Sequence, residues 1–339
     1  MEQYTIGIDI GGTKVAYALF DNRKKIVMRK NHPSKANLSA EAFFDEIVAN
    51  IQDIISDNHI AKENFRGVGI GMPSFILFEE GRIIKTVNLT KIKDFPARNY
   101  LESKLADVRI VFDNDAHAAA IAEHRHGAGR GFDNILYCPV GTGISSGIII
   151  NGNIFRGSYG WAGETGHMLL TPDDGVMCGC GNTGCFMSWT SGSMIIRHIE
   201  KWIQAGEKSS ITVFADNEQM NCSHLAEAYN SGDPLALRAI AQMVKLLGVW
   251  TYNLYVTFNI NCFVFGGGLL KMFQQLKGFK LTSGENAAGL LDAVKEVFDG
   301  YNKNSLPVYF KEAELSDTLS GDDFGTIGAN ELLFCNNGG

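Results

Sequence analysis

The chain has 339 residues, more than one compact hydrophobic core of ordinary size accommodates, so we expect two domains. Hydrophobic residues make up 45% and charged residues 20%, the proportions of a soluble globular protein. The formal net charge of −7 comes from interspersed charges of both signs without a Lys/Arg block. This argues against nucleic acid or an anionic membrane surface as the main partner and favours a small molecule.

The amino terminus, MEQYTIGIDIGG, has no basic region before its apolar run, and no later apolar stretch is long enough to cross a bilayer. We therefore expect a cytoplasmic protein with no membrane partner. The 7 cysteines are an odd number, with three clustered in one loop and the others scattered in apolar surroundings. This distribution is typical of a reducing compartment rather than of a disulfide framework.

Two distant segments repeat the pattern of strand, glycine turn and strand. Residues 5–21 read TIGIDIGGTKVAYALFD, and residues 135–153 read ILYCPVGTGISSGIIINGN. Alternation and β-branched residues predict the strands, and paired glycines predict turns that approach another group closely. The repetition indicates two domains of related fold. A third apolar strand, NCFVF, leads into Gly266-Gly267-Gly268.

These turns are interpreted as phosphate cradles, because glycine lets backbone N–H groups point at an anion and threonine hydroxyls add donors. A plain hairpin turn is the alternative for each turn taken alone. Asp9, just before the first turn, is placed to hold Mg²⁺ through water. The candidate residues for a nucleotide and its phosphates are Asp9, Gly11, Gly12, Thr13, Lys14, Gly141, Thr142, Gly143, Gly266, Gly267 and Gly268.

Two helices are well signalled. One follows Ser39, a plausible N-cap, and its apolar face consists of Phe43, Phe44, Ile47, Ile51, Ile54 and Ile55. The other begins at Asp233-Pro234, an N-cap followed by proline at the first helical position, and ends before the strand NCFVF. Residues 271–306 are expected to form helices with polar loops, without a functional assignment.

Transfer of phosphate to a hydroxyl needs a proton acceptor. The best candidate for this general base is Asp115 in VFDNDAHAAAIAEHRHG. The segment leaves a strand and enters an Ala-rich helix, so Asp115 is expected at or beside the helix N-terminus, where the dipole favours the ionised carboxylate. The alternative is that Asn114 or Asp115 merely caps the helix, and Asp113 is a rival for the base. Three histidines of the same helix are interpreted as solvated or packed: His117, His124 and His126.

The loop that follows Glu164 contains His167, Cys178, Cys180 and Cys185. One imidazole and three thiolates complete a tetrahedral ligand set, so a structural zinc site is predicted, against the alternative of unrelated buried side chains. Zinc on His167 would also brace Glu164. Side chains able to pair with sugar hydroxyls are Asn88, Asn114, Glu164 and His167. Trp161 is expected to be a core or rim aromatic that could also face a sugar.

Taken together, these motifs closely resemble the ROK family: Asp9-x-Gly11-Gly12-Thr13, Asn114-Asp115-Ala116, Gly141-Thr142-Gly143, Gly163-Glu164-x-Gly166-His167, Cys178-x-Cys180-Gly181-x-x-Gly184-Cys185 and Gly266-Gly267-Gly268. That family comprises sugar kinases and sugar-responsive repressors of the actin-like ATPase superfamily. The resemblance implies an α/β protein with two actin-like (ribonuclease-H-like) domains and a ligand cleft between them. It implies Asp115 as general base, contacts of Asn88, Asn114, Glu164 and His167 with the sugar, and a homodimer.

Two positions depart from the family pattern. Where the family continues Cys-x-Glu, this chain has Cys185-Phe186-Met187, and a thioether cannot accept hydrogen bonds as a carboxylate does. Where the family often has Gly-x-Pro-Gly, this chain has Gly71-Met72-Pro73-Ser74. Both changes touch the sugar side and spare the phosphate side, so they point to an unusual sugar.

The sequence therefore predicts an ATP-dependent kinase that phosphorylates a hydroxyl, the C6 hydroxyl first, of a free hexose or hexose derivative, with Asp115 as base, Mg²⁺ accompanying ATP and structural zinc. The expected domains are residues 1–115, completed by about 317–339, and residues 116–316, which contain the zinc loop 167–185. The alternative is a non-catalytic sugar sensor of the same family. Because four residues precede the first strand, we expect no DNA-binding domain ahead of it. An actin-type or Hsp70-type ATPase would lack the Glu164, His167 and zinc constellation.

Overall fold

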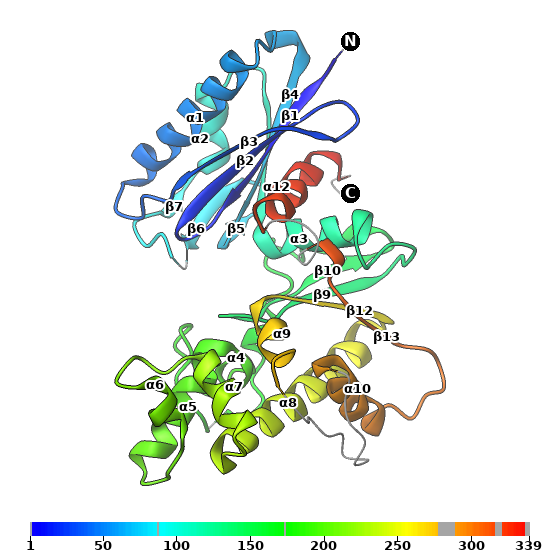
Figure 1. Ribbon diagram of the computed structural model, residues 1–339. Helices are drawn as coiled ribbons and strands as arrows, with labels where there is room; N and C mark the ends of the chain where they lie inside the picture. The colour runs from blue at the N-terminus through cyan, green and yellow to red at the C-terminus, as the bar shows by residue number, and fades with distance from the viewer. Residues whose placement is uncertain (1, 87, 173, 277–288, 316–320, 336–339) are drawn as a thin grey trace. The chain divides into compact units, whose positions relative to one another are not determined.

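The computed structural model describes residues 2–86, 88–172, 174–276, 289–315 and 321–335 (Figure 1). The chain divides into two compact units. The first comprises Met1–Tyr137, Gly147–Gly163 and Ala313–Gly339, and the second comprises Cys138–Ser146 and Glu164–Glu312. These units group residues 116–137 with the N-terminal part of the chain, whereas the first domain expected from the sequence ends at residue 115. The domain bounds expected from the sequence remain a prediction.

The main sheet of the first unit has the strand order β3-β2-β1-β4-β8. Its strands are β1 Tyr4–Ile10, β2 Lys14–Phe20, β3 Ile26–Pro33, β4 Phe65–Met72 and β8 Arg109–Asn114. The hairpin of β1 and β2 confirms the predicted strand, turn and strand in residues 5–21. Strands β1, β4 and β8 are parallel, and the register places Asp9 beside Gly71 and Gly71 beside Asp113. Three strands thus end together with two carboxylates in one row.

One face of this sheet is covered by α1 (Ala40–Asp57) and α2 (Ala97–Lys104). Apolar side chains of the parallel strands, such as Ile8, Ile70 and Phe112, form a single buried cluster with the apolar face of α1. The Ser39 side chain accepts a hydrogen bond from the Ala42 N–H, which confirms the expected N-cap.

The opposite face packs against α3 (Asp115–His126) and α12 (Gly321–Glu331), which lie together in Figure 1. Glycines make this close approach possible. A Cβ added to Gly7 would stand 2.0 Å from the Thr326 carbonyl oxygen, and one added to Gly69 would stand 1.9 Å from the Ala329 carbonyl oxygen. The glycines of β1 and β4 therefore allow α12 to pack closely against these strands. This packing places the C-terminal helix on the first sheet.

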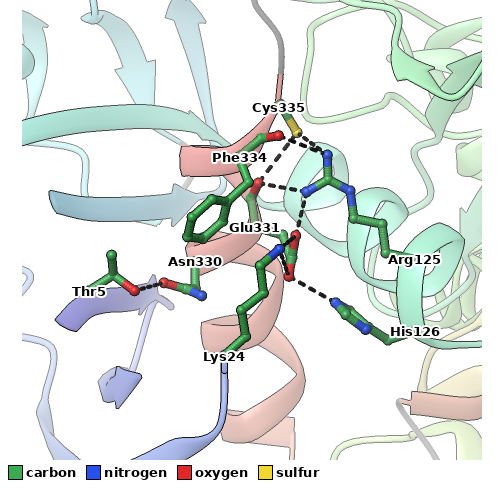
Figure 2. A network of polar contacts seen from close by, with 8 residues as sticks. All are labelled: Thr5, Lys24, Arg125, His126, Asn330, Glu331, Phe334 and Cys335. Carbon is green, nitrogen blue, oxygen red and sulfur yellow. Dashed lines mark hydrogen bonds and ion pairs between the residues drawn. The ribbon is translucent and has the colours of Figure 1, made fainter. Parts of the chain in front are cut away.

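A buried carboxylate fastens α12 to its neighbours (Figure 2). Glu331, with 1% of its side chain exposed, pairs with Lys24 at 2.9 Å, His126 at 2.9 Å and Arg125. Next to it, the Thr5 hydroxyl donates to the Asn330 side-chain oxygen at 2.7 Å. The end of α12 is thus tied to β1, to the loop after β2 and to the last turn of α3.

A three-stranded sheet in the order β5-β6-β7 follows β4 and is built from β5 Ser74–Leu77, β6 Arg82–Thr86 and β7 Lys93–Phe95. A second five-stranded sheet has the order β11-β10-β9-β12-β13. Its strands are β9 Ile135–Pro139, β10 Gly147–Ile150, β11 Asn153–Ile154, β12 Cys262–Gly266 and β13 Tyr309–Glu312. Strands β9 and β10 confirm the second predicted pair of strands, and β12 and β13 are parallel.

The second unit is mainly helical. Its helices are α4 Met187–Thr190, α5 Gly192–Gln204, α6 Ile211–Ala215, α7 Cys222–Asn230, α8 Pro234–Phe258, α9 Gly268–Phe273 and α10 Leu290–Tyr301. Short 3₁₀ turns span Lys62–Asn64, Thr165–His167 and Leu332–Phe334. The Asp233 side chain accepts from the N–H groups of Leu235 and Ala236, which confirms the predicted start of α8. Helix α10 confirms helix within residues 271–306, of which residues 277–288 lie outside the described part.

Among the helices that the structure describes, none has both the length and the apolar character that crossing a membrane requires.

Candidate functional site

The first glycine turn joins β1 to β2. The Gly11 N–H donates to the Lys14 carbonyl oxygen at 2.8 Å, and Thr13 and Lys14 are exposed at its tip. The Asn88 side chain lies against this turn, because a Cβ on Gly12 would stand 2.9 Å from both Asn88 Cβ and Nδ2. On the other side, the Asp9 carboxylate lies so close to Gly325 of α12 that a Cβ there would stand 2.1 Å from Asp9 Oδ2. Asp9, Asn88 and the glycine turn thus form one small region of the first unit.

The N-terminus of α3 holds the candidate base. Asn114 is the N-cap: its Oδ1 accepts from the Ala116 N–H at 2.8 Å, and its Nδ2 donates to the Ser74 carbonyl oxygen at 3.2 Å. Asp115 is the first helical residue, as predicted, and one of its oxygens also accepts from the Ala116 N–H at 3.0 Å. The capping role considered for this pair therefore belongs chiefly to Asn114, and Asp115 is left exposed to solvent.

Two opposing effects act on the Asp115 carboxyl. Desolvation by the surrounding protein outweighs the Ala116 N–H and the charge of His117, so the pKa of Asp115 lies above its ordinary value. Because solvent reaches the side chain, desolvation is weaker than for an enclosed carboxyl, and the helix dipole also favours the anion. We therefore expect Asp115 to be ionised at neutral pH.

Asp113, the rival candidate, is enclosed by partners. With 1% of its side chain exposed, it accepts from Arg156 Nε at 2.8 Å through Oδ2, and from the Asn114 N–H at 2.7 Å through Oδ1. His117 Nδ1 lies 2.8 Å from the same Oδ1. Burial raises the pKa of Asp113, but the charges and hydrogen bonds of His117 and Arg156 outweigh burial and hold its pKa below the ordinary value. A carboxylate so committed is a poor proton acceptor for a substrate.

The second glycine turn belongs to the second unit. The Gly141 N–H donates to the Gly143 carbonyl oxygen at 3.0 Å, and the Gly141 carbonyl oxygen accepts from the Gly192 N–H at the start of α5 at 2.8 Å. Gly267, with φ of 100°, lies against the same hairpin, because a Cβ there would stand 2.5 Å from the Val140 carbonyl oxygen. The structure therefore brings the predicted turns at 141–143 and 266–268 together.

A cavity of about 640 Å³ opens beside these two turns. Gly141, Thr142 and Gly268 line it, as do residues of α5, α7, α9 and the loop before α7 that the sequence did not predict. Those lining residues are Gly192, Ser193, Ile196, Arg197, Glu200, Gln219, Met220, Asn221, Cys222, Leu269 and Met272. They carry no motif, so only the packing of α5, α7 and α9 could reveal them. A glycine-walled cavity with a mixed polar and apolar lining suits a nucleotide.

The four predicted metal ligands form one cluster. The ligand atoms of His167, Cys178, Cys180 and Cys185 all lie within 4.8 Å of one another. Cys178 Sγ is 3.6 Å from His167 Nδ1, and Cys180 Sγ is 3.5 Å from Cys185 Sγ. A tetrahedron with zinc ligand bonds of about 2.0–2.3 Å has edges of about 3.3–3.8 Å, so the donor set fits zinc.

The other ring nitrogen of His167 faces a carboxylate. His167 Nε2 lies 3.9 Å from Glu164 Oε2, while Nδ1 faces the thiols. The two nitrogens therefore have separate surroundings within the second unit, as the double role predicted for His167 requires. Left-handed backbone at Gly184, φ 83°, lets the loop turn where a Cβ would stand 1.9 Å from the Thr171 carbonyl oxygen.

The two departures from the family pattern have defined places. The Met187 methyl group would contact a Cβ on Gly143 at 3.4 Å, and its Cβ would be equally close to one on Gly166. Met187 therefore lies between the second glycine turn and the His167 segment. Ser74 is buried and donates to the Met72 carbonyl oxygen at 3.1 Å. Trp161 donates to the Ile76 carbonyl oxygen at 2.9 Å and is 38% exposed, so it is a surface aromatic and not a core one.

A sequence model described as ROK family matches residues 5–282. A glucokinase of Halalkalibacterium halodurans is 30% identical over 98% of this chain and 95% of that protein. The xylose repressor of Bacillus subtilis is 30% identical over 76% of this chain and 62% of its own length.

Two solved structures of that family are similar in fold. The ROK hexokinase of Thermus thermophilus has a TM-score of 0.78 and 26% identity over 98% of this chain and 97% of that one. The ROK family glucokinase of Streptomyces griseus, in complex with glucose and AMPPNP, has a TM-score of 0.70 and 27% identity over 97% and 98%. The expected α/β class with the actin-like fold is thus confirmed. On sequence and on fold alike, the chain belongs to the ROK family.

Proposed function

We propose that this protein is an ATP-dependent sugar kinase that phosphorylates a hydroxyl, the C6 hydroxyl first, of a free hexose or hexose derivative. The observation that carries the proposal is the exposed Asp115 carboxylate at the N-terminus of α3, in the unit that also carries the Gly11–Thr13 turn. Relatives over nearly the whole chain are glucokinases, and one related structure holds glucose and an ATP analogue. These relatives support a phosphotransferase with an alcohol group as acceptor.

In this proposal Asp115 accepts the proton of the sugar hydroxyl as its oxygen attacks the γ-phosphorus and ADP leaves. Ionised Asp115 is the competent form, which its exposure and the helix dipole favour. Asn114 is held by its bonds to the Ala116 N–H and to the Ser74 carbonyl oxygen, so its amide is oriented before substrate arrives. The proposed sugar contacts are Asn88, Asn114, Glu164 and His167.

ATP is assigned to the glycine turns. The cavity beside Gly141, Thr142 and Gly268 would take the nucleoside. The glycine turns would bind the phosphates through N–H groups other than those of Gly11 and Gly141, which donate within their own hairpins. Asp9 and the Gly11–Thr13 turn are the partners for Mg²⁺ and the transferring phosphate, since Mg²⁺ commonly keeps its waters and takes one or two carboxylates. Mg²⁺ bound there would neutralise charge that develops on the transferring group.

Zinc is assigned to His167, Cys178, Cys180 and Cys185, whose geometry fits it. Zinc there would be structural, because four protein ligands fill a tetrahedron and leave no position for a reacting water. By holding His167 Nδ1 it would orient Nε2 toward Glu164 and the sugar.

The test is ADP release from Mg-ATP with glucose, fructose, mannose, allose, galactose, N-acetylglucosamine and N-acetylmannosamine, each at saturating concentration. A strong response to one sugar supports the kinase and names the sugar that the Met187 site accepts. The position of the phosphate in that product then tests the C6 assignment. A flat panel, obtained with folded protein that binds a sugar in calorimetry, would overturn the kinase in favour of a sensor.

A further inference from the structure

His117 lies in the interior of the first unit, with 2% of its side chain exposed. Both of its ring nitrogens face oxygen acceptors. Nδ1 lies 2.8 Å from Asp113 Oδ1, and Nε2 lies 2.8 Å from the Ala162 carbonyl oxygen. Both distances are those of good hydrogen bonds.

A neutral imidazole carries only one N–H group and can donate to only one of these oxygens. The other nitrogen would then place a lone pair against a lone pair in a site closed to water. A carbonyl oxygen cannot donate. Asp113 is kept from donating by Arg156 and the Asn114 N–H, which need its anion as acceptor. The imidazolium is therefore the form that satisfies both contacts.

We propose that His117 is held as a buried imidazolium and is a positioning residue, which joins the turn bearing Asn114 and Asp115 to the segment that leads into Glu164. The proposal rests on the proposed function only for its effect on phosphoryl transfer. Asp113 immediately precedes Asn114 and Asp115, and Ala162 lies two residues before Glu164. One ring thus holds the backbone next to the candidate base and next to a candidate sugar ligand.

The charges around His117 balance in its protonated form. Asp113 is the anion, and Arg156 is a second cation that donates to Asp113 Oδ2. Arg156 Cζ also lies 3.7 Å from the centroid of the Phe78 ring. This leaves one excess positive charge, and Asp115, two residues before His117 on the same helix, is the carboxylate that it favours as an anion. The Asp113 network therefore supports the proton-accepting form of Asp115.

Among described neighbours, the other elements against α3 bring few further charges toward His117. Strands β10 and β11 have no titratable side chain, and β4 offers only Arg66, which is exposed. On α12, Asp323 pairs with Arg29, and Glu331 pairs with Arg125 and His126 at the far end of α3. Asp113, the Ala162 carbonyl oxygen and Arg156 are thus the groups that set its charge.

Burial by itself lowers the pKa of His117, but Asp113 and the Ala162 carbonyl oxygen outweigh burial, so the pKa lies above the ordinary 6.5. A raised histidine pKa means that its stabilising effect is complete below about 6.5 and is lost as pH rises through the folded value. Loss of the proton breaks one of the two contacts. Turnover is therefore expected to fall on the alkaline side with the pKa of His117.

The direct test is side-chain ¹⁵N and ¹³C NMR of the full-length protein, with histidines assigned by comparing His117→Gln and His124→Gln. At about pH 8, where free histidine is neutral, His117 is expected to show two protonated ring nitrogens. His124, whose Nε2 has one contact to the Phe132 carbonyl oxygen, is expected to be a neutral tautomer. A single N–H on His117 at this pH would overturn the proposal. This readout requires no kinase activity and no folded variant, since the wild-type signals can also be assigned through bonds.

The kinetic test compares the same variants on the sugar that responds. His117→Gln is expected to lower kcat roughly 10- to 100-fold, as small misplacements of catalytic groups do, with the KM for ATP unchanged and the alkaline limb of the kcat profile lost. His124→Gln is expected to keep the wild-type rate and profile. An unchanged kcat profile in His117→Gln would refute the positioning role. An imidazolium in a protein that phosphorylates no sugar would refute the kinase but leave the charge state of His117 intact.

Discussion

Asp115 is the residue on which the proposed chemistry depends. Asp115→Asn keeps the helix start, because Asn114 is the N-cap and an amide oxygen can also accept from the Ala116 N–H. We expect kcat to fall by about 10²–10⁴, the usual contribution of a positioned base, with sugar binding retained in calorimetry.

The matched control for this variant is Asp57→Asn, at the exposed end of α1. It makes the same chemical change away from the site and is expected to leave kcat unaltered. Near-normal turnover in Asp115→Asn would remove Asp115 from the base role. Asp113 would not replace it easily, since both its oxygens are taken by Arg156, His117 and the Asn114 N–H.

The stability of the protein is expected to depend on pH through Glu331, a buried carboxylate paired with Lys24, Arg125 and His126. Burial raises its pKa, but the hydrogen bonds of His126, Lys24 and Arg125 outweigh burial and lower the pKa to about 2 (Figure 2). A carboxyl with a depressed pKa stabilises the fold above its ordinary value of 4.5, and this stabilisation is lost as pH falls toward 2. The melting temperature is therefore expected to drop steeply on acidification through this window.

Glu331→Gln removes the anion and leaves Lys24, Arg125 and His126 without their shared partner. We expect a loss of about 1–3 kcal/mol in the free energy of unfolding, less than for a fully buried ion pair, because the three cations are partly exposed and water can solvate them. Its melting temperature should also depend less on pH below 4.5 than that of the wild type. Glu102→Gln, on the exposed surface of α2, is the control and should match the wild type. Equal stability of all three proteins would contradict a stabilising role for the ion pairs of Glu331.

At the scale of elements, α12 depends on glycines in the strands beneath it. Gly69→Ala would place a Cβ 1.9 Å from the Ala329 carbonyl oxygen, so the helix must move. We expect a destabilisation of about 1–3 kcal/mol in denaturant unfolding. Gly300→Ala, in α10 with open space around its Cα, should be neutral or slightly stabilising because alanine favours helix. If both variants have wild-type stability, α12 does not pack closely against Gly69.

The zinc loop is a second element whose shape depends on a few side chains. Protein purified without added metal is expected to carry about one zinc per chain, because the four ligand atoms already stand at the spacing of a tetrahedral site. Cys180→Ser should lose the zinc and lower the melting temperature. Cys222→Ser changes a cysteine outside the cluster and should retain the metal. A folded, active wild type without zinc would rule out the site.

At the scale of the whole molecule, the proposed nucleotide site and the proposed base belong to different compact units. The cavity assigned to the nucleoside lies in the second unit, and Asp115 lies in the first. Ser193→Trp would fill part of the cavity beside Thr142, and we expect the KM for ATP to rise about tenfold, equivalent to about 1.4 kcal/mol of lost binding, with sugar affinity unchanged. Asp115→Asn should show the reverse pattern, with kcat reduced and the KM for ATP retained.

The control for the cavity variant is Ser103→Trp, which adds the same side chain to an exposed position of α2. It should leave both kinetic constants unaltered. If Ser193→Trp also leaves the KM for ATP unchanged, the nucleotide does not occupy this cavity.

The sequence by itself determined those features of the protein that depend on a few neighbouring residues. The strands around the glycine turns, the N-caps Ser39 and Asp233 and the start of α3 at Asp115 follow from periodicity and capping, which act over a few residues. The metal ligand set was also readable, because its three cysteines lie within one short loop. The base and sugar-contact assignments came from the predicted helix start and from side-chain chemistry, together with the family resemblance, and remain proposals.

Only the tertiary structure decided which distant residues meet. Arg156 reaches Asp113 across 43 positions, His117 reaches Ala162 across 45, and Glu331 reaches Lys24 across 307. The same holds for the lining of the cavity by Ser193, Arg197 and Asn221. An isolated arginine or histidine belongs to no local sequence pattern. Its partner depends on how the intervening chain folds, and many weak contacts determine that fold. The charge of His117 is therefore a property of the folded molecule, since only there do two oxygens face its two nitrogens.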